Sequence, residues 1–375
     1  MTIRLRHAAS MLALAAVLGM TACETAPPPA PPPPPAYVPP PPPLPNLALS
    51  QSIIDQAAIY QGYMQRASAI QTPFTSAESV QSGLQRAQAF NAQQLQRGAV
   101  AYGAVVALQD PTFVSAVREL GRDPNQRAAL VQRLLSEPGY AVAFNGSASA
   151  AGLVVSALNQ QGATLLATGN RVKQQAYDVQ RQRWAMADIP RRPERLQAAR
   201  DAATPLTADA SQAGVLRSAA YGEAPMALTA ASAGPPYTPT VARALAIAAI
   251  AALGEADGVN APAVEALLTE PSSGACLNLT RLMLYQCLSV AKPWYEDVFC
   301  LGQHILIDTA NCVNRAAGAA TPIIAPTTPA VTTANVTPVP QASVNAAAAG
   351  ASPAQAAAAA NAPTPTAPPA ATPPR

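Results

Sequence analysis

Residues 151–179 read AGLVVSALNQQGATLLATGNRVKQQAYDV and carry the clearest structural signal in the chain. Small and apolar residues recur there at alternating steps of four and three positions: Ala151, Val155, Leu158, Gly162, Leu165, Gly169, Val172, Ala176 and Val179. This spacing predicts a long helix with a coiled-coil seam. Glycine inside a helix costs about 1 kcal/mol relative to alanine. Gly162 and Gly169 therefore predict that a neighbouring helix approaches closely.

A second helical pattern lies upstream. Thr75 and Glu78 have the spacing of a capping box, and apolar residues follow at steps of three and four until Asp110-Pro111. We expect 76–108 and 140–186 to form a long antiparallel pair, with shorter connecting helices within 112–136. Farther along, Val241–Leu253 is apolar on every side but only 13 residues long. That length is too short for a membrane span and predicts a buried helix.

The N-terminus combines a positive start, an apolar stretch and a cysteine. Arg4 and Arg6 precede the apolar run Met11–Gly19, which ends in Met20-Thr21-Ala22-Cys23. These four residues resemble the lipobox of bacterial lipoproteins, with methionine in place of the usual leucine. The resemblance implies that residues 1–22 are a signal peptide and that Cys23 carries acyl chains such as palmitate. Because Glu24 rather than Asp follows, the resemblance also favours the outer membrane over the inner one, with the protein facing the periplasm.

Prolines dominate the residues after this cysteine. Of the 19 residues from Pro27 to Pro45, 14 are proline. Such a run adopts polyproline II, at about 3.1 Å per residue, and predicts a stiff stalk of roughly 60 Å.

Composition then divides the chain into six parts. They are the signal peptide 1–22, the acylated cysteine and stalk 23–46, a long-helix domain 47–203, a loop-rich linker 204–240, a C-terminal helical part 241–318, and a disordered Pro/Ala/Thr-rich tail 319–375. The tail is expected to be disordered because it has almost no large apolar side chains. Without residues 1–22 the formal net charge falls from +3 to +1. So small a net charge gives no electrostatic attraction for nucleic acid.

Four further cysteines, Cys276, Cys287, Cys300 and Cys312, lie close together. In an exported protein an even number predicts two disulfides. Helices over 275–291 and 297–316, joined near Lys292-Pro293-Trp294, would place Cys287 beside Cys300 and Cys276 beside Cys312. This arrangement resembles nested helical hairpins with twin cysteine pairs, in architecture only.

The spacing of these cysteines raises a difficulty for the nested pairing. Eleven residues return an ideal helix to within about 20° of the same face, whereas twelve leave about 120°. One helix must therefore bend, or the pairing is one of the other two that four cysteines allow. Zinc binding is the alternative to disulfides. However, no two of these cysteines have the C-x₂-C spacing, which is typical both of zinc sites and of redox-active cysteine pairs.

Few residues are candidates for catalysis or ligand binding. His304 and Asp308 are four positions apart on one predicted helix face, an arrangement compatible with general-base work or metal ligation. The structural alternative is a histidine hydrogen-bonded across the hairpin, with Glu296 and Asp297 complementing the helix dipole at the start of the helix. Basic residues gather between 171 and 200, where they could contact anionic lipid or acidic glycans, or form a solvated helix end: Arg171, Lys173, Arg181, Arg183, Arg191, Arg192, Arg195 and Arg200. The sequence shows no nucleophile elbow, Walker motif or dinucleotide fingerprint.

The expected fold is therefore all-α: a long antiparallel helix pair plus a C-terminal disulfide-linked helical hairpin, flanked by the stalk and the tail. In composition and layout the body resembles uncharacterised helical envelope lipoproteins of alphaproteobacteria. The expected function is that of a non-catalytic structural or assembly lipoprotein of the cell envelope, with envelope proteins or the cell wall as partners. A lipid- or small-ligand-binding module is the alternative, followed by a hydrolase that uses His304. No cofactor or metal is expected.

Overall fold

The computed structural model describes residues 41–229 and 231–318, and all regular secondary structure in that part is helical, which confirms the all-α class. These residues belong to one compact unit. The first elements are α1 (Gln51–Ser68), α2 (Ala77–Gln88), α3 (Ala92–Ala107), α4 (Pro111–Leu120), α5 (Pro124–Ser136), the 3₁₀-helix η1 (Pro138–Ala143) and α6 (Ser147–Val179). The remaining ones are α7 (Arg183–Met186), α8 (Arg192–Asp201), α9 (Ala210–Ala220), α10 (Pro239–Ala252), the 3₁₀-helix η2 (Gly258–Asn260), α11 (Ala261–Ala266), α12 (Pro271–Val290), α13 (Trp294–Cys300), the π-helix η3 (Leu301–Ile307) and α14 (Asp308–Ala317).

Helix α6 is the long helix that the four-and-three pattern predicts, and its seam is buried apart from half-buried Val155. The two seam glycines lie where another helix comes closest. A Cβ atom at Gly169 would stand 2.8 Å from Cγ1 of Ile307, and one at Gly162 would overlap the Asn314 side chain. The predicted close approach is confirmed, and the approaching elements are η3 and α14.

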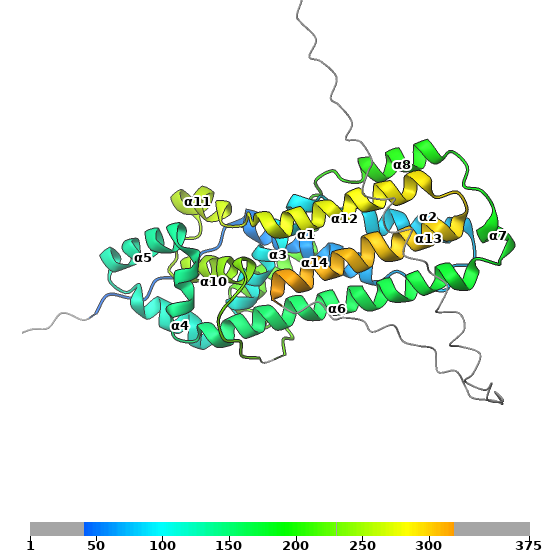
Figure 1. Cartoon of the computed structure of the whole chain (residues 1–375). Coiled ribbons are helices and arrows are strands. Elements are labelled where there is room, and N and C mark those ends of the chain that lie inside the picture. Colours follow the sequence, from blue (N-terminus) through cyan, green and yellow to red (C-terminus); the bar gives the residue numbers. More distant parts are fainter. Residues whose placement is uncertain (1–40, 230, 319–375) are drawn as a thin grey trace, which may run out of the picture. The chain divides into compact units, whose positions relative to one another are not determined.

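The partner of α6 differs from the expected one. Most of its packing is against the continuous helix formed by α13, η3 and α14, while α3 contacts it less extensively. Figure 1 shows α13 and α14 lying between α6 and α12. The expected partner 76–108 is not one helix, because the chain breaks at Ala89–Asn91 into α2 and α3. Small seam residues indicate how closely a neighbour packs, but they do not specify which neighbour it is.

The start of α2 is also shifted from its predicted position. The N-cap is Ser76, whose side chain accepts a hydrogen bond from the Ser79 backbone N–H, and the Ser79 hydroxyl accepts one in return from the Ser76 N–H. This capping box lies one residue later than the predicted Thr75–Glu78 pair. Asn91 caps α3 in a similar way through the Gln94 N–H.

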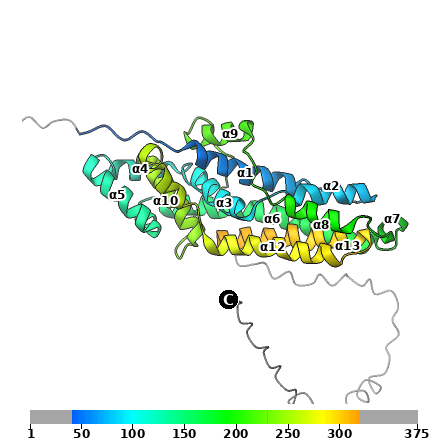
Figure 2. The same ribbon diagram turned by 90° about the horizontal axis from the view of Figure 1, so that it is seen from above.

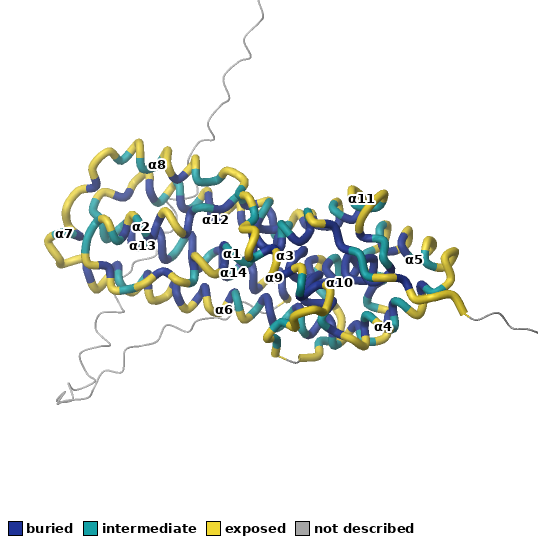
Figure 3. Tube along the Cα trace, turned by 180° about the vertical axis from the view of Figure 1, so that it is seen from behind, coloured by how far each residue is buried: buried dark blue, intermediate teal, exposed yellow. Residues whose placement is uncertain are grey.

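Small aliphatic side chains form the centre of the body. Helix α10 packs across α3, which in turn packs along α1. Every residue from Ala244 to Ala252 is buried, so the predicted buried helix at 241–253 is confirmed. Gly98 permits the contact between α3 and α1, because a Cβ there would stand 2.6 Å from the Gln56 carbonyl oxygen. Figure 3 shows the continuous buried core around α3 and α10.

The predicted division at 204–240 does not separate two packing units. This stretch contains α9, which packs on α1, and α10 beyond it packs on α3 from the N-terminal part. The view in Figure 2 shows α10 crossing next to α4 and α5. Residues 47–203 and 241–318 therefore share one core.

Membrane-spanning potential in the described part is confined to one bent helix pair. No single helix there has the length and apolar content needed to cross a bilayer. Only α3 and α4 taken together meet that test, and they are bent by 88° at their junction.

Candidate functional site

Two disulfides join α12 to the continuous helix α13–η3–α14. Cys287 is bonded to Cys300 and Cys276 to Cys312, with Cα–Cα distances of 5.7 and 5.8 Å. The predicted hairpin and its nested pairing are therefore confirmed. Cys23, the predicted lipidation site, lies outside the described residues, as do the signal peptide, most of the stalk and the tail.

The π-helix η3 resolves the spacing difficulty. It lies between Cys300 and Cys312, where twelve residues separate the two sulfurs. A π turn closes hydrogen bonds to the fifth residue rather than the fourth and so accommodates one extra residue. Twelve residues then cover nearly the angle that eleven cover on α12, and both cysteines face the partner helix.

The π segment also carries His304. Its Nδ1 atom lies 3.1 Å from Oδ2 of Asp308, and the other carboxylate oxygen of Asp308 accepts a hydrogen bond from the Gln303 amide at 3.0 Å. Lys173 from α6 donates to the Gln303 side-chain oxygen at 2.8 Å. The predicted His304–Asp308 contact therefore exists, within a chain of hydrogen bonds that ties η3 to α6.

The basic residues between 171 and 200 separate into two groups. Arg192 and Arg195 donate to carbonyl oxygens at the end of α12, which satisfies groups that a helix C-terminus leaves unpaired. Arg195 also forms a bidentate pair with Asp297 at 2.7 and 2.8 Å. The exposed members are Arg171, Arg181, Arg183, Arg191 and Arg200. Part of this basic cluster therefore caps the C-terminus of α12, and the rest is exposed to solvent.

Asp297 has an unusual electrostatic environment. Its side chain is fully buried, whereas that of Arg195 is 11% exposed. Burial raises the pKa of the Asp297 carboxyl to about 6, and the neighbouring Arg195 guanidinium opposes that rise. From its position in the first turn of α13, this residue was expected only to complement the helix dipole.

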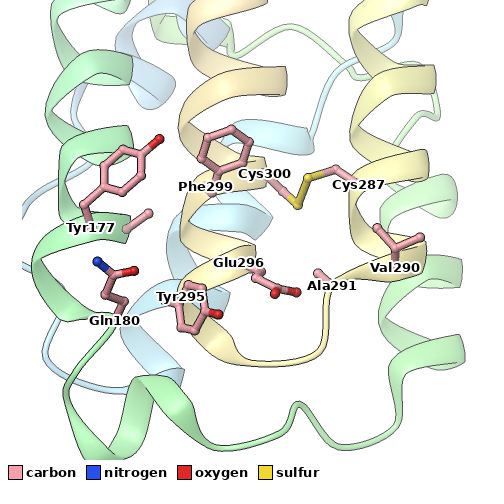
Figure 4. A pocket seen from close by; sticks show the side chains of 10 residues that line it. Tyr177, Gln180, Cys287, Val290, Ala291, Tyr295, Glu296, Phe299 and Cys300 are labelled. Atoms are coloured by element: carbon pink, nitrogen blue, oxygen red, sulfur yellow. A yellow bond between two sulfur atoms is a disulfide. The ribbon is translucent and has the colours of Figure 1, made fainter. Parts of the chain in front are cut away.

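A groove opens beside the Cys287–Cys300 disulfide at the end of the hairpin. Its volume is about 450 Å³, and its lining comes from α6, the end of α12 and α13: Ala176, Tyr177, Gln180, Cys287, Val290, Ala291, Tyr295, Glu296, Phe299 and Cys300. In Figure 4, Tyr177 and Phe299 lie on one side of the groove and Val290 on the other, with Glu296 between them. The rings of Tyr177 and Phe299 meet edge to face, with centroids 6.5 Å apart.

Sequence reasoning did not find this groove. Tyr295 and Phe299 are one helical turn apart, a spacing that places them on one face of α13. Tyr177 comes from α6, more than a hundred positions earlier. The aromatic pair was visible as a pattern, but its meeting with Tyr177 depends on the unpredicted packing of α6 against α13.

No family model, curated protein or solved structure matches this chain. Among residues 41–229 and 231–318, no three His, Cys, Asp or Glu side chains are grouped so as to hold a metal ion. Besides the groove, helix α12 exposes three large apolar side chains, Leu279, Leu282 and Val290, and the functional proposals rest on these two features.

Proposed function

We propose that this protein is a lipid-anchored, non-catalytic lipoprotein of the cell envelope whose helical body docks to a partner protein. The lipobox-like Met20-Thr21-Ala22-Cys23 supports the anchor, and the proline-rich run supports a spacer between membrane and body. The two disulfides support export, because such bonds persist in oxidising compartments such as the periplasm.

The outward face of α12 is the observation that carries the docking proposal. Helix α12 is 20 residues long, and its one charged residue, Arg281, is buried. On the outward face Leu279, Leu282 and Val290 are exposed by 57%, 60% and 68%. Exposed faces of helices in globular proteins are normally polar or charged, and apolar patches with a polar rim are typical of interaction sites.

The neighbouring helix provides the contrast. Helix α8 lies beside α12 and exposes Glu194, Arg200 and Asp201 to solvent. An interface core depleted of charge next to a charged rim is the usual anatomy of a protein–protein contact. These features favour a protein partner over the cell wall.

Site-specific photocrosslinking in intact envelopes tests this proposal. A photoreactive residue at position 282, on the α12 face, should give a discrete crosslinked product with another envelope protein. The same residue at Gln132, exposed on α5, serves as the matched control and should give no such product. Equal yields at the two positions, or no product at position 282, would contradict docking through α12.

A further inference from the structure

We propose that the groove beside the Cys287–Cys300 disulfide binds a small organic cation of the quaternary ammonium type, as in choline. This ligand class goes beyond the anchoring and docking roles. It follows from the side chains that line the groove, from the charge they carry and from a contact that one of the rings already makes.

Three aromatic rings contribute to the groove: Tyr177 from α6, and Tyr295 and Phe299 from α13. The faces of aromatic rings are electron-rich and attract cations, and quaternary ammonium groups are bound in cages of such rings. Tyr177 is 50% exposed although it lies against Phe299. Its ring is therefore accessible to a ligand rather than covered by the body of the protein.

Glu296 adds a negative charge to this aromatic lining. One of its carboxylate oxygens accepts a hydrogen bond from the Lys292 backbone N–H at 2.8 Å, which orients the side chain at the turn between α12 and α13. Figure 4 shows the carboxylate between Tyr295 and Ala291, below the disulfide. The lining includes no lysine, arginine or histidine. The lining therefore offers a cation one carboxylate and three aromatic residues, whereas an anion would meet a like charge; the Lys173 ammonium, which contacts the Phe299 ring, lies outside the lining.

The Phe299 ring contacts an ammonium group of the protein itself, that of Lys173, which is not part of the groove lining. The Nζ atom of Lys173 lies 5.5 Å from the centroid of the Phe299 ring, within the distance at which cation–π attraction acts. Lys173 is held there by its hydrogen bond to Gln303. The same ring also lines the groove. With a volume of about 450 Å³ the groove falls within the range of small-molecule sites.

Calorimetric titration of the full, disulfide-bonded chain with choline tests the proposal. The neutral analogue 3,3-dimethylbutan-1-ol has the same shape without the charge and separates cation recognition from apolar binding. Choline is expected to bind about tenfold more tightly than this alcohol. Equal affinities would show a merely apolar groove, and no saturable choline binding would show no site; either result would overturn the proposal.

Variants assign the binding to the groove. Glu296→Gln keeps a hydrogen-bond acceptor for Lys292 but removes the charge, and it should weaken choline binding about fivefold while leaving the alcohol unchanged. Tyr177→Ala should weaken choline binding to a similar degree, whereas Tyr177→Phe, which keeps the ring, should not. Val215→Ala, at an exposed residue of α9 outside the groove, is the control and should leave choline binding unchanged. An unchanged affinity in both Glu296→Gln and Tyr177→Ala would overturn the assignment.

Discussion

The region around the hairpin helices α12 and α13 is held together by different interactions from those in the centre of the body. Around α3 and α10 the core consists of small aliphatic side chains that fit closely, with hardly any buried charge. Around α12 and α13 the interior contains a buried arginine, a buried ion pair and two disulfides. The aliphatic core makes the body compact, whereas the polar groups and cross-links fix the position of the hairpin that carries both proposed binding surfaces.

Arg281 shows how the hairpin region depends on individual polar contacts. Arg281 is 4% exposed, and its guanidinium donates to the carbonyl oxygens of Gln88, Phe90 and Ala199. The Tyr285 hydroxyl accepts two further bonds, and the Phe90 ring lies 4.9 Å from the guanidinium carbon. Arg281 thus joins α12 to the break between α2 and α3 and to α8.

Replacement of Arg281 is expected to have the largest effect on the stability of the fold. Arg281→Met removes the guanidinium donor from three buried carbonyl groups, of which that of Gln88 keeps a bond from the Phe90 N–H. The variant should lower the free energy of unfolding by about 3–5 kcal/mol. Urea titration with the disulfides intact measures the change. Arg217→Met, at an exposed arginine of α9, is the control and should stay within about 0.5 kcal/mol of the wild type. A comparable loss in both variants would remove the special role of Arg281.

The two disulfides should differ in their contributions. They close segments of 36 and 13 residues, and a longer loop costs the unfolded chain more entropy. Replacing Cys276 and Cys312 by serine should therefore destabilise the fold by about 4 kcal/mol, and replacing Cys287 and Cys300 by about 3 kcal/mol. Urea unfolding of the two double variants gives the comparison. The reverse order would indicate that local strain or residual unfolded structure outweighs loop length.

Asp297 should give the hairpin a pH dependence that the aliphatic core lacks. Its pKa is about 6 in the folded protein and 3.8 in its ordinary state, so the folded chain binds the proton more tightly. Its contribution to stability is therefore largest below about pH 4 and declines as the pH rises through about 6, by about 3 kcal/mol in total. Asp297→Asn should remove this decline in urea midpoints measured from pH 4 to 7. A midpoint that falls equally in both proteins would assign the dependence to other groups.

A seam glycine should give the smallest effect of the series. Gly169→Ala places a methyl group against Ile307 and should destabilise the fold by about 1–2 kcal/mol. Gly214→Ala on α9 meets open space and should instead stabilise it by about 0.5–1 kcal/mol, since alanine is the better helix former. Thermal unfolding of the two variants measures both. Stabilisation by both substitutions would show that helix propensity, not the close approach of η3, governs position 169.

Much of this architecture could be predicted from the sequence because it depends on local spacing. The long helix, the buried helix at 241–253 and the cysteine hairpin all follow from periodicity, length and position. The π segment was visible only as a mismatch of one residue between the two cysteine spacings. The sequence indicated that one helix deviates or that the pairing is not nested, and the packing of η3 against α6 determines where the helix deviates.

The candidate sites were harder to predict from the sequence, because they depend on which elements pack against each other. The groove joins Tyr177 of α6 to two rings of α13, and no spacing rule connects them. Arg281 did leave a signal: it is the one charge in an otherwise uncharged 20-residue helix. A lone charge of this kind predicts a buried group with dedicated partners, since charged residues are seldom fully buried unless paired.

Metabolic labelling with a palmitate analogue tests the anchored lipoprotein account most directly. The wild-type chain should incorporate the label and fractionate with the envelope, with Cys276, Cys287, Cys300 and Cys312 unreactive towards thiol reagents. Cys23→Ser should lose the label, because it lacks the one thiol that the lipobox-like segment presents. Equal labelling of the two proteins, or a cytosolic wild type with four free thiols, would contradict the account.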